Sequence, residues 1–364
     1  MQALFPEFEW TELSLPARYF SWRVRGNPLS WAITHQSLLQ KPYDLILATS
    51  MVDLACLRGL RPELCAVPAI LYFHENQFAY PTTERQSSLL EAKLVSLYSS
   101  LSAERVIFNT CYNRETFLCG VDELIDRFPD EKPANIASKI RSKSICLPVG
   151  IEESDDRSAA KQAGLVNIVW NHRWEYDKGP ERLLACLEML REDLPICVHV
   201  LGQQFRQQPK EFSGIRKVLL KRGWLGKWGY VNSYSDYLQI LSSSHLVIST
   251  AIHDFQGLAL LEAVEAGCIP LVPNRLAYPE IFPLEYRYES HVEDVVLDAR
   301  SLGESIAKHV DQISDGERLS APSVSQFHWS TLKPAYQAAF ESLVAEGVSF
   351  APFNPQHRQA QKEV

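Results

Sequence analysis

Short apolar runs alternate with amphipathic segments along most of the chain. In the first half, the apolar runs predict strands over residues 11–15, 43–49, 69–73, 105–109 and 144–147. The segments between them predict helices over residues 29–39, 53–60, 88–102 and 113–118, the third with leucines at the spacing of one helix face. This alternation indicates an α/β domain built on a parallel sheet.

The same alternation begins again after a polar, charged stretch at residues 151–164, which we interpret as a linker. Strands are expected over residues 167–170, 196–201, 228–231, 246–249 and 269–272. Helices are expected over residues 181–192, 209–222, 234–243, 258–266, 292–302, 302–313 and 329–346. A chain of 364 residues also exceeds the size at which one hydrophobic core keeps growing. We therefore predict two domains, 1–150 and 165–325, then a helix over 326–346 and a polar tail over 347–364.

The start of the chain does not fit a complete nucleotide-type domain. Such a domain opens with a buried strand and a tight turn, whereas residues 1–10 read as the end of a helix. We expect the first strand to be missing from the first sheet. The alternative is that residues 1–15 fold differently.

Composition sets broad limits on the class of protein. Apolar residues make up 46% and charged residues 22%, as in ordinary globular proteins, and no apolar run reaches membrane-spanning length. The first ten residues lack the basic region of a signal peptide. The eight cysteines form no C-x-x-C pair, which argues against zinc and fits free thiols in a reducing cytoplasm. The net charge of −8 argues against a protein that coats nucleic acid nonspecifically.

Candidate chemistry is densest in the stretch STAIHDFQGLALLEAVEAGCIPLVP, residues 249–273, which reads as strand, loop, helix and strand. Ligands of open α/β sheets bind beyond the carboxyl ends of the strands, where helix N–H groups favour phosphate. Asp254 lies in the loop, and Glu262 lies between Leu261 and Ala263 in an apolar helix, where a carboxylate needs a partner such as a ribose diol. The alternative is a purely structural unit with an acid near a helix N-terminus.

A second cluster, WNHRWEYDKGP, follows the first strand of the second domain. Its Arg173 and Lys178 are suited to bind a diphosphate together. The alternative is a solvated loop in which these cations pair with Glu175 and Asp177.

A third cluster, His74, Glu75 and Asn76, lies at a strand end in the first domain. Polar residues in that position commonly hold a substrate. A structural histidine is the alternative.

At these motifs the chain resembles a known family. HDFQGLALLEAVEAG resembles the C-terminal signature of retaining family 4 glycosyltransferases of the GT-B fold, and HRWEYDKGP resembles their Arg and Lys pair. LPVGI, WGYVNSYSDYLQILSSSHLVIST and FHWSTLKPAY resemble further parts of that fold. LPARYFSWRVRGN, LACLRGLRPEL, LYFHENQFAYP, VIFNTCYNRETFL, IVWNHRWEYDKGPE and AYPEIFP together resemble the tRNA-queuosine mannosyltransferases, over residues 13–336.

The resemblance implies an α/β protein with two facing Rossmann-like domains, a cleft between them and a last helix that returns to the first domain. It implies GDP-mannose as donor, the cyclopentenediol of queuosine in the tRNA anticodon loop as acceptor, and no metal or other cofactor. Retention would proceed by same-face attack with the leaving phosphate as base, so no carboxylate nucleophile is assigned. The donor-binding residues would be Arg173, Lys178, Asp254, Phe255, Gln256, Gly257, Leu258 and Glu262.

Within that set the resemblance implies separate roles. Glu262 would bind the ribose and Asp254 a hydroxyl of the sugar, while the N–H groups of residues 256–258 and the two cations would bind the diphosphate. His74 would position the sugar near its reacting carbon, and it joins Arg173, Lys178, Asp254 and Glu262 as a predicted catalytic residue. Two features depart from the family: the first acid of the signature is usually Glu, and the family's N-terminal strand and His-bearing loop have no counterpart before Thr11.

For a tRNA acceptor, cations and stacking surfaces are needed. Arg18, Arg23 and Arg25, interleaved with Trp22 and its aromatic neighbours, are the first candidates, and Glu75 and Asn76 would join His74 on the acceptor side. A basic helix with Lys210, Arg216, Lys217, Lys221 and Arg222 is the second candidate. A solvated or packed face is the alternative for each.

Three functions remain open from the sequence. The first is a cytoplasmic queuosine-tRNA mannosyltransferase, without a membrane or an obligatory protein partner. The second is a family 4 enzyme with another sugar nucleotide and a glycan or small-molecule acceptor. The third is a nucleotide- or tRNA-binding protein without turnover.

Overall fold

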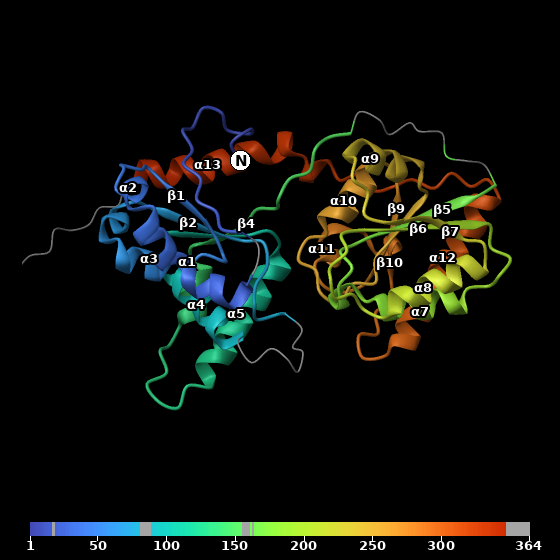
Figure 1. Ribbon diagram of the computed structural model, residues 1–364, viewed down its shortest axis with the longest axis horizontal. Coiled ribbons are helices and arrows are strands. Elements are labelled where there is room, and N and C mark those ends of the chain that lie inside the picture. The colour runs from blue at the N-terminus through green and yellow to red at the C-terminus, as the bar shows by residue number, and fades with distance from the viewer. Residues whose placement is uncertain (17–18, 81–88, 155–160, 162–163, 347–364) are drawn as a thin grey trace, which may run out of the picture.

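The computed structural model describes residues 1–16, 19–80, 89–154, 161 and 164–346. Two parallel sheets, each with helices on both faces, lie side by side and form the two halves of the molecule (Figure 1). The α/β class predicted from the alternation of apolar runs is confirmed. Arg18, one of the predicted acceptor-binding residues, lies outside the described residues.

The first sheet has the order β1-β2-β3-β4 and is parallel throughout. Its strands are β1 (Ile46–Thr49), β2 (Ala69–Phe73), β3 (Arg105–Phe108) and β4 (Ser144–Cys146). The helices of this half are α1 (Phe20–Thr34), α2 (Gln36–Leu39), α3 (Leu54–Leu60), α4 (Leu89–Ser102), α5 (Cys111–Asp126) and α6 (Ile136–Arg141). Apolar side chains of α3 to α6 form a core against one face of the sheet.

The second sheet has the order β10-β9-β8-β5-β6-β7 and is also parallel. Its strands are β5 (Val166–Asn171), β6 (Ile196–Leu201), β7 (Leu225–Gly229), β8 (Leu246–Ile248), β9 (Ile269–Pro273) and β10 (Arg287–Tyr288). One face packs against α7 (Pro180–Met189), α8 (Glu211–Lys221) and α12 (Val295–Ser314). The other packs against α9 (Tyr234–Ser243), α10 (Leu258–Glu265) and α11 (Tyr278–Ile281).

The strand order of the second sheet reverses next to β5. From β5 the chain runs outward through β6 and β7, then returns to β8 on the other side of β5 and runs outward through β9 and β10. Ligands of open parallel sheets bind at such a reversal, beyond the carboxyl ends of the strands. The loops after β5 and β8 meet there, and they contain two of the predicted clusters.

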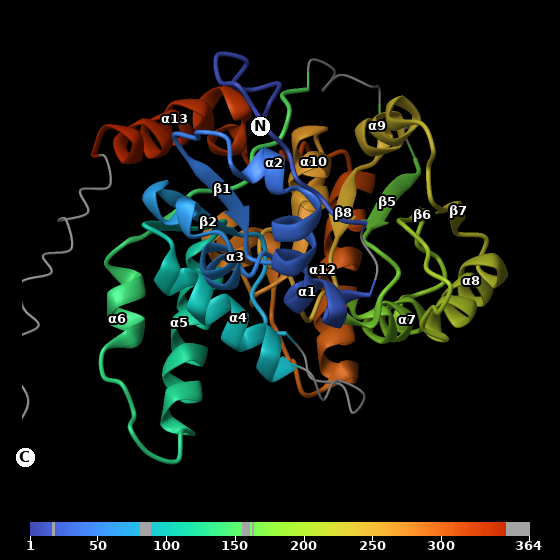
Figure 2. The ribbon, with the colours of Figure 1, turned by 60° about the vertical axis from the view of Figure 1, so that its left-hand side comes forward.

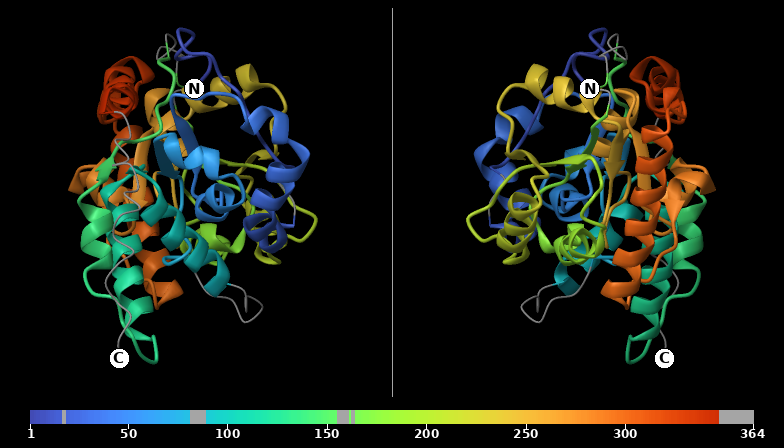
Figure 3. Two further views of the ribbon diagram at one scale, coloured as in Figure 1. Left: turned by 90° about the vertical axis from the view of Figure 1, so that its left-hand side faces the viewer. Right: turned by 90° about the vertical axis from the view of Figure 1, so that its right-hand side faces the viewer.

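The chain passes between the two halves twice, and the two passages run side by side. The Ile151 N–H donates to the Phe327 carbonyl (2.8 Å), and the Trp329 N–H donates to the Ile151 carbonyl (3.1 Å). The last helix, α13 (Trp329–Glu346), then packs with Phe5 on the second face of the first sheet. Figures 2 and 3 show α13 and the N-terminal segment along the same side of the molecule.

Several predicted elements differ from the structure. Residues 11–15 form no strand, because Leu13 and Leu15 instead pack on a small core with Trp31 and Leu57. Residues 1–10 form turns, and α1 starts earlier than predicted. The two helices predicted on either side of residue 302 form one helix, α12. Gly303 lets α12 pack closely on α7 and does not interrupt the helix. Within the described ranges, no helix is long and apolar enough to cross a membrane.

Candidate active site

A cavity of about 390 Å³ opens at the carboxyl edge of the second sheet. Its walls come from the loops after β5, β6, β7 and β8, from α9 and from the start of α10. Five predicted donor-binding residues line it, namely Arg173, Lys178, Asp254, Gly257 and Leu258. The structure thus brings two clusters that are far apart in sequence to one cavity at the strand reversal.

The loops after β5 and β8 are held together by a set of backbone and side-chain hydrogen bonds. The N–H groups of Ile252 and His253 both donate to the Asp177 carbonyl (2.9 and 3.1 Å). The Thr250 hydroxyl donates to the Lys178 carbonyl (2.7 Å). Gly179 has φ +64°, and a Cβ there would lie 2.2 Å from the Thr250 carbonyl oxygen, so only glycine fits this approach. The loop backbone is therefore fixed before any ligand binds.

Lys178 is the buried cation of the cavity, with a side chain 10% exposed. Its Nζ donates to the His253 carbonyl (2.7 Å) and lies 3.3 Å from an Asp177 carboxylate oxygen and 3.7 Å from one of Asp254. Burial acts to raise the pKa of Asp254, but the charge of Lys178, an N–H group and the Tyr278 hydroxyl hold it below its usual value. Asp254 is therefore ionised, and Lys178 is shared between two carboxylates.

Arg173 lies at the more open side of the cavity. Its side chain is 51% exposed, and its guanidinium lies 3.2 Å from a Glu175 carboxylate oxygen. The ion pairs that formed the alternative interpretation of this loop are therefore present. Because Arg173 and Lys178 also line the cavity, the two interpretations are compatible.

His172 contributes a neutral ring to the cavity wall. Burial, with the nearby charge of Lys178, lowers its pKa to about 3. Its Nε2 is buried and has no hydrogen-bond partner among the described residues. A Cβ on Gly202 would lie 1.8 Å from the His172 carbonyl oxygen, so the loop after β6 approaches β5 closely only because residue 202 is glycine.

Glu262 lies behind the cavity wall and finds its partner within the protein. The Tyr237 hydroxyl donates to its carboxylate (3.0 Å), and the Asn171 amide donates to the Tyr237 oxygen (3.1 Å). Burial raises the pKa of Glu262, and the Tyr237 hydrogen bond offsets part of the rise. Tyr237 and Asn171 line the cavity whereas Glu262 does not, so the ribose expected as its partner would meet it at the Tyr237 end.

Some residues of the loop over residues 254–258 line the cavity, and others contact the first half of the molecule. One Asp254 carboxylate oxygen accepts the N–H groups of Gln256 (3.4 Å) and Gly257 (3.0 Å). Two of the three N–H groups predicted for the diphosphate are thus used within the loop. The Leu258 N–H, at the start of α10, has no partner in the described part of the chain and remains available to a ligand.

Phe255 and Gln256, predicted to bind the donor, do not line the cavity and instead contact the first half. The Gln256 amide donates to the Val149 carbonyl (2.7 Å) and accepts the Val149 N–H (3.0 Å). The Phe255 carbonyl accepts the Thr110 hydroxyl (2.8 Å). These two residues therefore hold the loop against the first half, and their contact with the donor stays a prediction.

Two further contacts join the halves near this loop. The Glu280 carboxylate accepts the N–H groups of Cys111 (2.9 Å) and Tyr112 (2.5 Å), the first two residues of α5. The Tyr80 and His253 rings meet at 4.5 Å. Negative charge at a helix N-terminus is stabilising, so Glu280 both caps α5 and connects the halves.

Of the first-domain cluster, Glu75 faces the cations of the second half. Burial raises the pKa of Glu75, while the charges of Arg173 and Lys178 act to lower it. His74 is exposed at the end of β2, with its ring 4.6 Å from that of Tyr72, and it does not line the cavity.

Asn76 has a structural role, in contrast to its predicted contact with the acceptor. It is fully buried, and its amide donates to Asn113 and Thr116 on α5. Its side-chain oxygen accepts the N–H groups of Phe78 and Ala79. An enclosed amide with these partners holds the loop to α5 and presents no group to a ligand.

Three of the predicted RNA-binding residues, Trp22, Arg23 and Arg25, lie in the first turns of α1. Trp22 is 73% exposed, Arg23 is partly buried, and Arg25 pairs with the buried Asp53 at 2.6 Å. On the alternative basic helix, α8, the Arg222 guanidinium donates to two backbone carbonyls and lies over the Trp224 ring. That cation is therefore used in packing.

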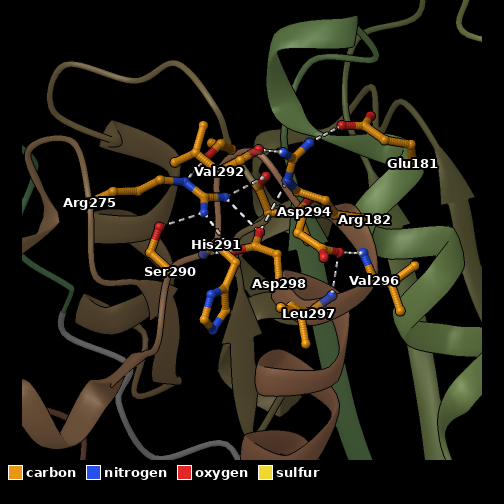
Figure 4. A network of polar contacts seen from close by, with 12 residues as sticks. Glu181, Arg182, Arg275, Ser290, His291, Val292, Asp294, Val296, Leu297 and Asp298 are labelled. Carbon is orange, nitrogen blue, oxygen red and sulfur yellow. Dashed lines mark hydrogen bonds and ion pairs between the residues drawn. The ribbon is translucent and has the colours of Figure 1, made fainter.

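A buried ion network that the sequence did not reveal joins α7, α12 and the segment after β9 (Figure 4). Asp298 is 1% exposed and pairs with Arg275 (2.7 Å) and Arg182 (3.1 Å). Arg275 also donates to the carbonyls of Thr250 (3.3 Å) and Ala251 (2.9 Å) in the loop after β8. The network therefore fixes the backbone that carries the predicted signature.

Within the residues that the structure describes, no set of three or more histidine, cysteine or acidic side chains is placed to hold a metal ion. The charged side chains on the cavity wall are those of Arg173, Lys178 and Asp254. Two of these three are cationic, which suits a negatively charged ligand.

Comparisons with known proteins agree with this geometry. A family profile described as tRNA-queuosine alpha-mannosyltransferase N-terminal matches residues 1–151. The tRNA-queuosine alpha-mannosyltransferase of Drosophila melanogaster is 35% identical over 290 residues, which are 76% of this chain and 75% of that protein.

Solved structures share the fold at low identity. The pneumococcal O-GlcNAc transferase GtfA in complex with UDP and GlcNAc is 14% identical with a TM-score of 0.57, covering 85% of this chain and 59% of that one. Anabaena Alr3699/HepE in complex with UDP and glucose is 14% identical with a TM-score of 0.58, covering 85% and 81%. The predicted GT-B fold is confirmed. The chain therefore belongs to the tRNA-queuosine alpha-mannosyltransferase family and is a glycosyltransferase of the GT-B fold.

Proposed function

We propose that the protein transfers mannose from GDP-mannose to the cyclopentenediol of queuosine in the tRNA anticodon loop, with retention of configuration. The observation that carries the proposal is the cavity at the strand reversal, where Arg173, Lys178 and the start of α10 converge. The family's description, tRNA-queuosine alpha-mannosyltransferase, supports transfer of mannose to queuosine in tRNA, and GDP-mannose is the donor that we expect. We expect the reaction to take place in the cytoplasm.

The chemistry requires stabilisation of the departing diphosphate. When the bond between the sugar and the phosphate breaks, negative charge develops on the diphosphate, and preorganised cations and N–H dipoles lower the barrier. Lys178, held by three oxygen neighbours, is preorganised for this role. Arg173 and the Leu258 N–H complete the set, and we propose that these groups act without a metal ion.

Retention follows from attack on the face that the diphosphate leaves. The oxygen of the acceptor hydroxyl forms the new bond to the anomeric carbon of the sugar. The bond between that carbon and the oxygen of the diphosphate breaks, and the proton of the hydroxyl passes to this departing oxygen. No protein carboxylate takes part in covalent chemistry. Asp254, ionised beside Lys178, is positioned to accept a hydrogen bond from a sugar hydroxyl.

The acceptor would approach from the first half of the molecule. Glu75 faces the cations of the donor cavity, and His74 is exposed beside it. The exposed Trp22 ring and the cations Arg23 and Arg25 would contact the anticodon loop by stacking and phosphate pairing.

The test is to incubate the protein with GDP-mannose and queuosine-containing tRNA and to weigh the modified nucleoside by mass spectrometry. The expected result is a gain of one hexose, which is absent with tRNA carrying guanosine at the same position and with UDP-glucose as donor. Hydrolysis of another sugar nucleotide, or transfer to a glycan, would replace the proposal with the broader family 4 activity. Tight GDP or tRNA binding without turnover would make the protein a binding module.

A further inference from the structure

Two cysteines from different elements are in direct contact at the surface of the first half. Cys111 is exposed at the start of α5, and Cys146 is half-buried at the end of β4. Their sulfur atoms are 3.1 Å apart, with the Cys111 thiol donating to the Cys146 sulfur. A disulfide bond is about 2.05 Å long, so bond formation requires the sulfurs to move together by only about 1 Å.

Contacts with the second half of the molecule are made by Cys111 itself and by a residue close to Cys146 in the sequence. The Cys111 N–H donates to Glu280 of the second half (2.9 Å). Three residues after Cys146, Val149 exchanges two hydrogen bonds with Gln256. A disulfide between the two cysteines would therefore form next to the contact with Glu280 and three residues before the contact with Gln256.

We propose that Cys111 and Cys146 form an oxidation site that hydrogen peroxide converts into an intramolecular disulfide. In the first step the Cys111 thiol gives up its proton and its sulfur attacks one oxygen of the peroxide; the O–O bond breaks, the departing hydroxide takes up that proton to form water, and the sulfur becomes a sulfenic acid. In the second step the Cys146 sulfur attacks the Cys111 sulfur; the S–O bond breaks, and the departing hydroxide takes the Cys146 proton to form water. The two thiols lose two electrons and two protons, and one peroxide is reduced to two waters.

The surroundings assign the two roles. Cys111 is the accessible thiol, so it meets the peroxide first. Burial raises the pKa of Cys146 to about 12, and Cys146 is the less accessible of the two sulfurs, so it stays a thiol while Cys111 is oxidised and acts as the resolving partner. The second step should accordingly accelerate as the pH rises.

The test uses the full chain treated with hydrogen peroxide in modest excess, alkylated and digested without reduction. Peptide mass mapping should find a Cys111–Cys146 cross-linked peptide as the main disulfide, and dithiothreitol should reverse it. Cys119 offers the matched control, because it is also exposed on α5 but its sulfur contacts the Glu123 carboxylate (3.6 Å). Cys119→Ser should leave the yield of the cross-link unchanged.

A second variant tests the assignment of roles. With Cys146→Ser, the sulfenic acid on Cys111 has no resolving thiol, so dimedone should label Cys111 at least tenfold more than in the wild type. The proposal is overturned if wild-type Cys111 and Cys119 oxidise equally without a cross-link. It is also overturned if dimedone labelling of Cys111 does not rise in Cys146→Ser.

Discussion

Replacing Lys178 by methionine should impair both turnover and stability, because the ammonium group serves two buried carboxylates. The Asp177 side chain is 1% exposed, and its carboxylate oxygens have no hydrogen-bond partner in the described part of the chain apart from the ion pair with Lys178. Removing one partner of a buried pair costs about 3–5 kcal/mol, since the other charge is left uncompensated. On the scale of domains of about 150–250 residues, which includes the second half, the melting temperature of that half should fall by about 6 °C or more.

Arg173 provides the comparison. Its side chain is half exposed, so its ion pair with Glu175 contributes at most about 1 kcal/mol to stability. Arg173→Ala should therefore leave the melting temperature within about 4 °C of the wild type. If both cations stabilise the departing diphosphate, each single variant should lower kcat at least about a hundredfold.

Asp177→Asn added to Lys178→Met separates the two effects. Neutralising the unpaired carboxylate should restore most of the lost stability but none of the lost turnover. The measurements are thermal melting without ligand and initial rates at saturating donor. The reasoning fails if Lys178→Met melts like the wild type, if the double variant regains turnover together with stability, or if both single variants keep near-normal rates.

Three further predictions concern the other parts of the site. Burial raises the pKa of Glu262, so this carboxylate should become protonated, and donor affinity should fall, as the pH drops below neutrality. Glu262→Gln should bind the donor more weakly at neutral pH, and its affinity should not depend on pH in this range. Titration calorimetry measures both effects. Gln256→Ala removes both hydrogen bonds to Val149, so kcat should fall while GDP affinity stays within about twofold, because this side chain does not line the cavity. Arg23→Ala should weaken tRNA binding and flatten its dependence on salt, with GDP affinity unchanged; unaltered tRNA affinity would remove this segment from the RNA site.

The location of the cavity follows from the sequence because it depends on local rules. A strand that ends in a loop with Arg173 and Lys178, and a later strand that ends at Asp254, must place these residues at one edge of a parallel sheet. Only the strand order, with β5 beside β8, was needed to bring the two loops together.

Pairings between distant side chains did not follow from the sequence. The Tyr237 hydroxyl donates a hydrogen bond to Glu262, and Arg275 forms an ion pair with Asp298. The members of each pair lie far apart in the sequence, and no periodic pattern relates them. The roles of Asn76 and Gln256 were missed for a related reason. An amide looks the same in a sequence whether it faces a ligand or, as here, holds a backbone segment of another element.

The central claim is that the cavity at the strand reversal binds the donor nucleotide by its diphosphate. The most direct measurement is an experimental structure of the protein with GDP bound in the absence of divalent ions. The account predicts that the diphosphate lies within hydrogen-bond distance of Lys178 and Arg173, with the ribose hydroxyls beside Tyr237 and Glu262. A diphosphate bound elsewhere, with no contact to either cation, would contradict it.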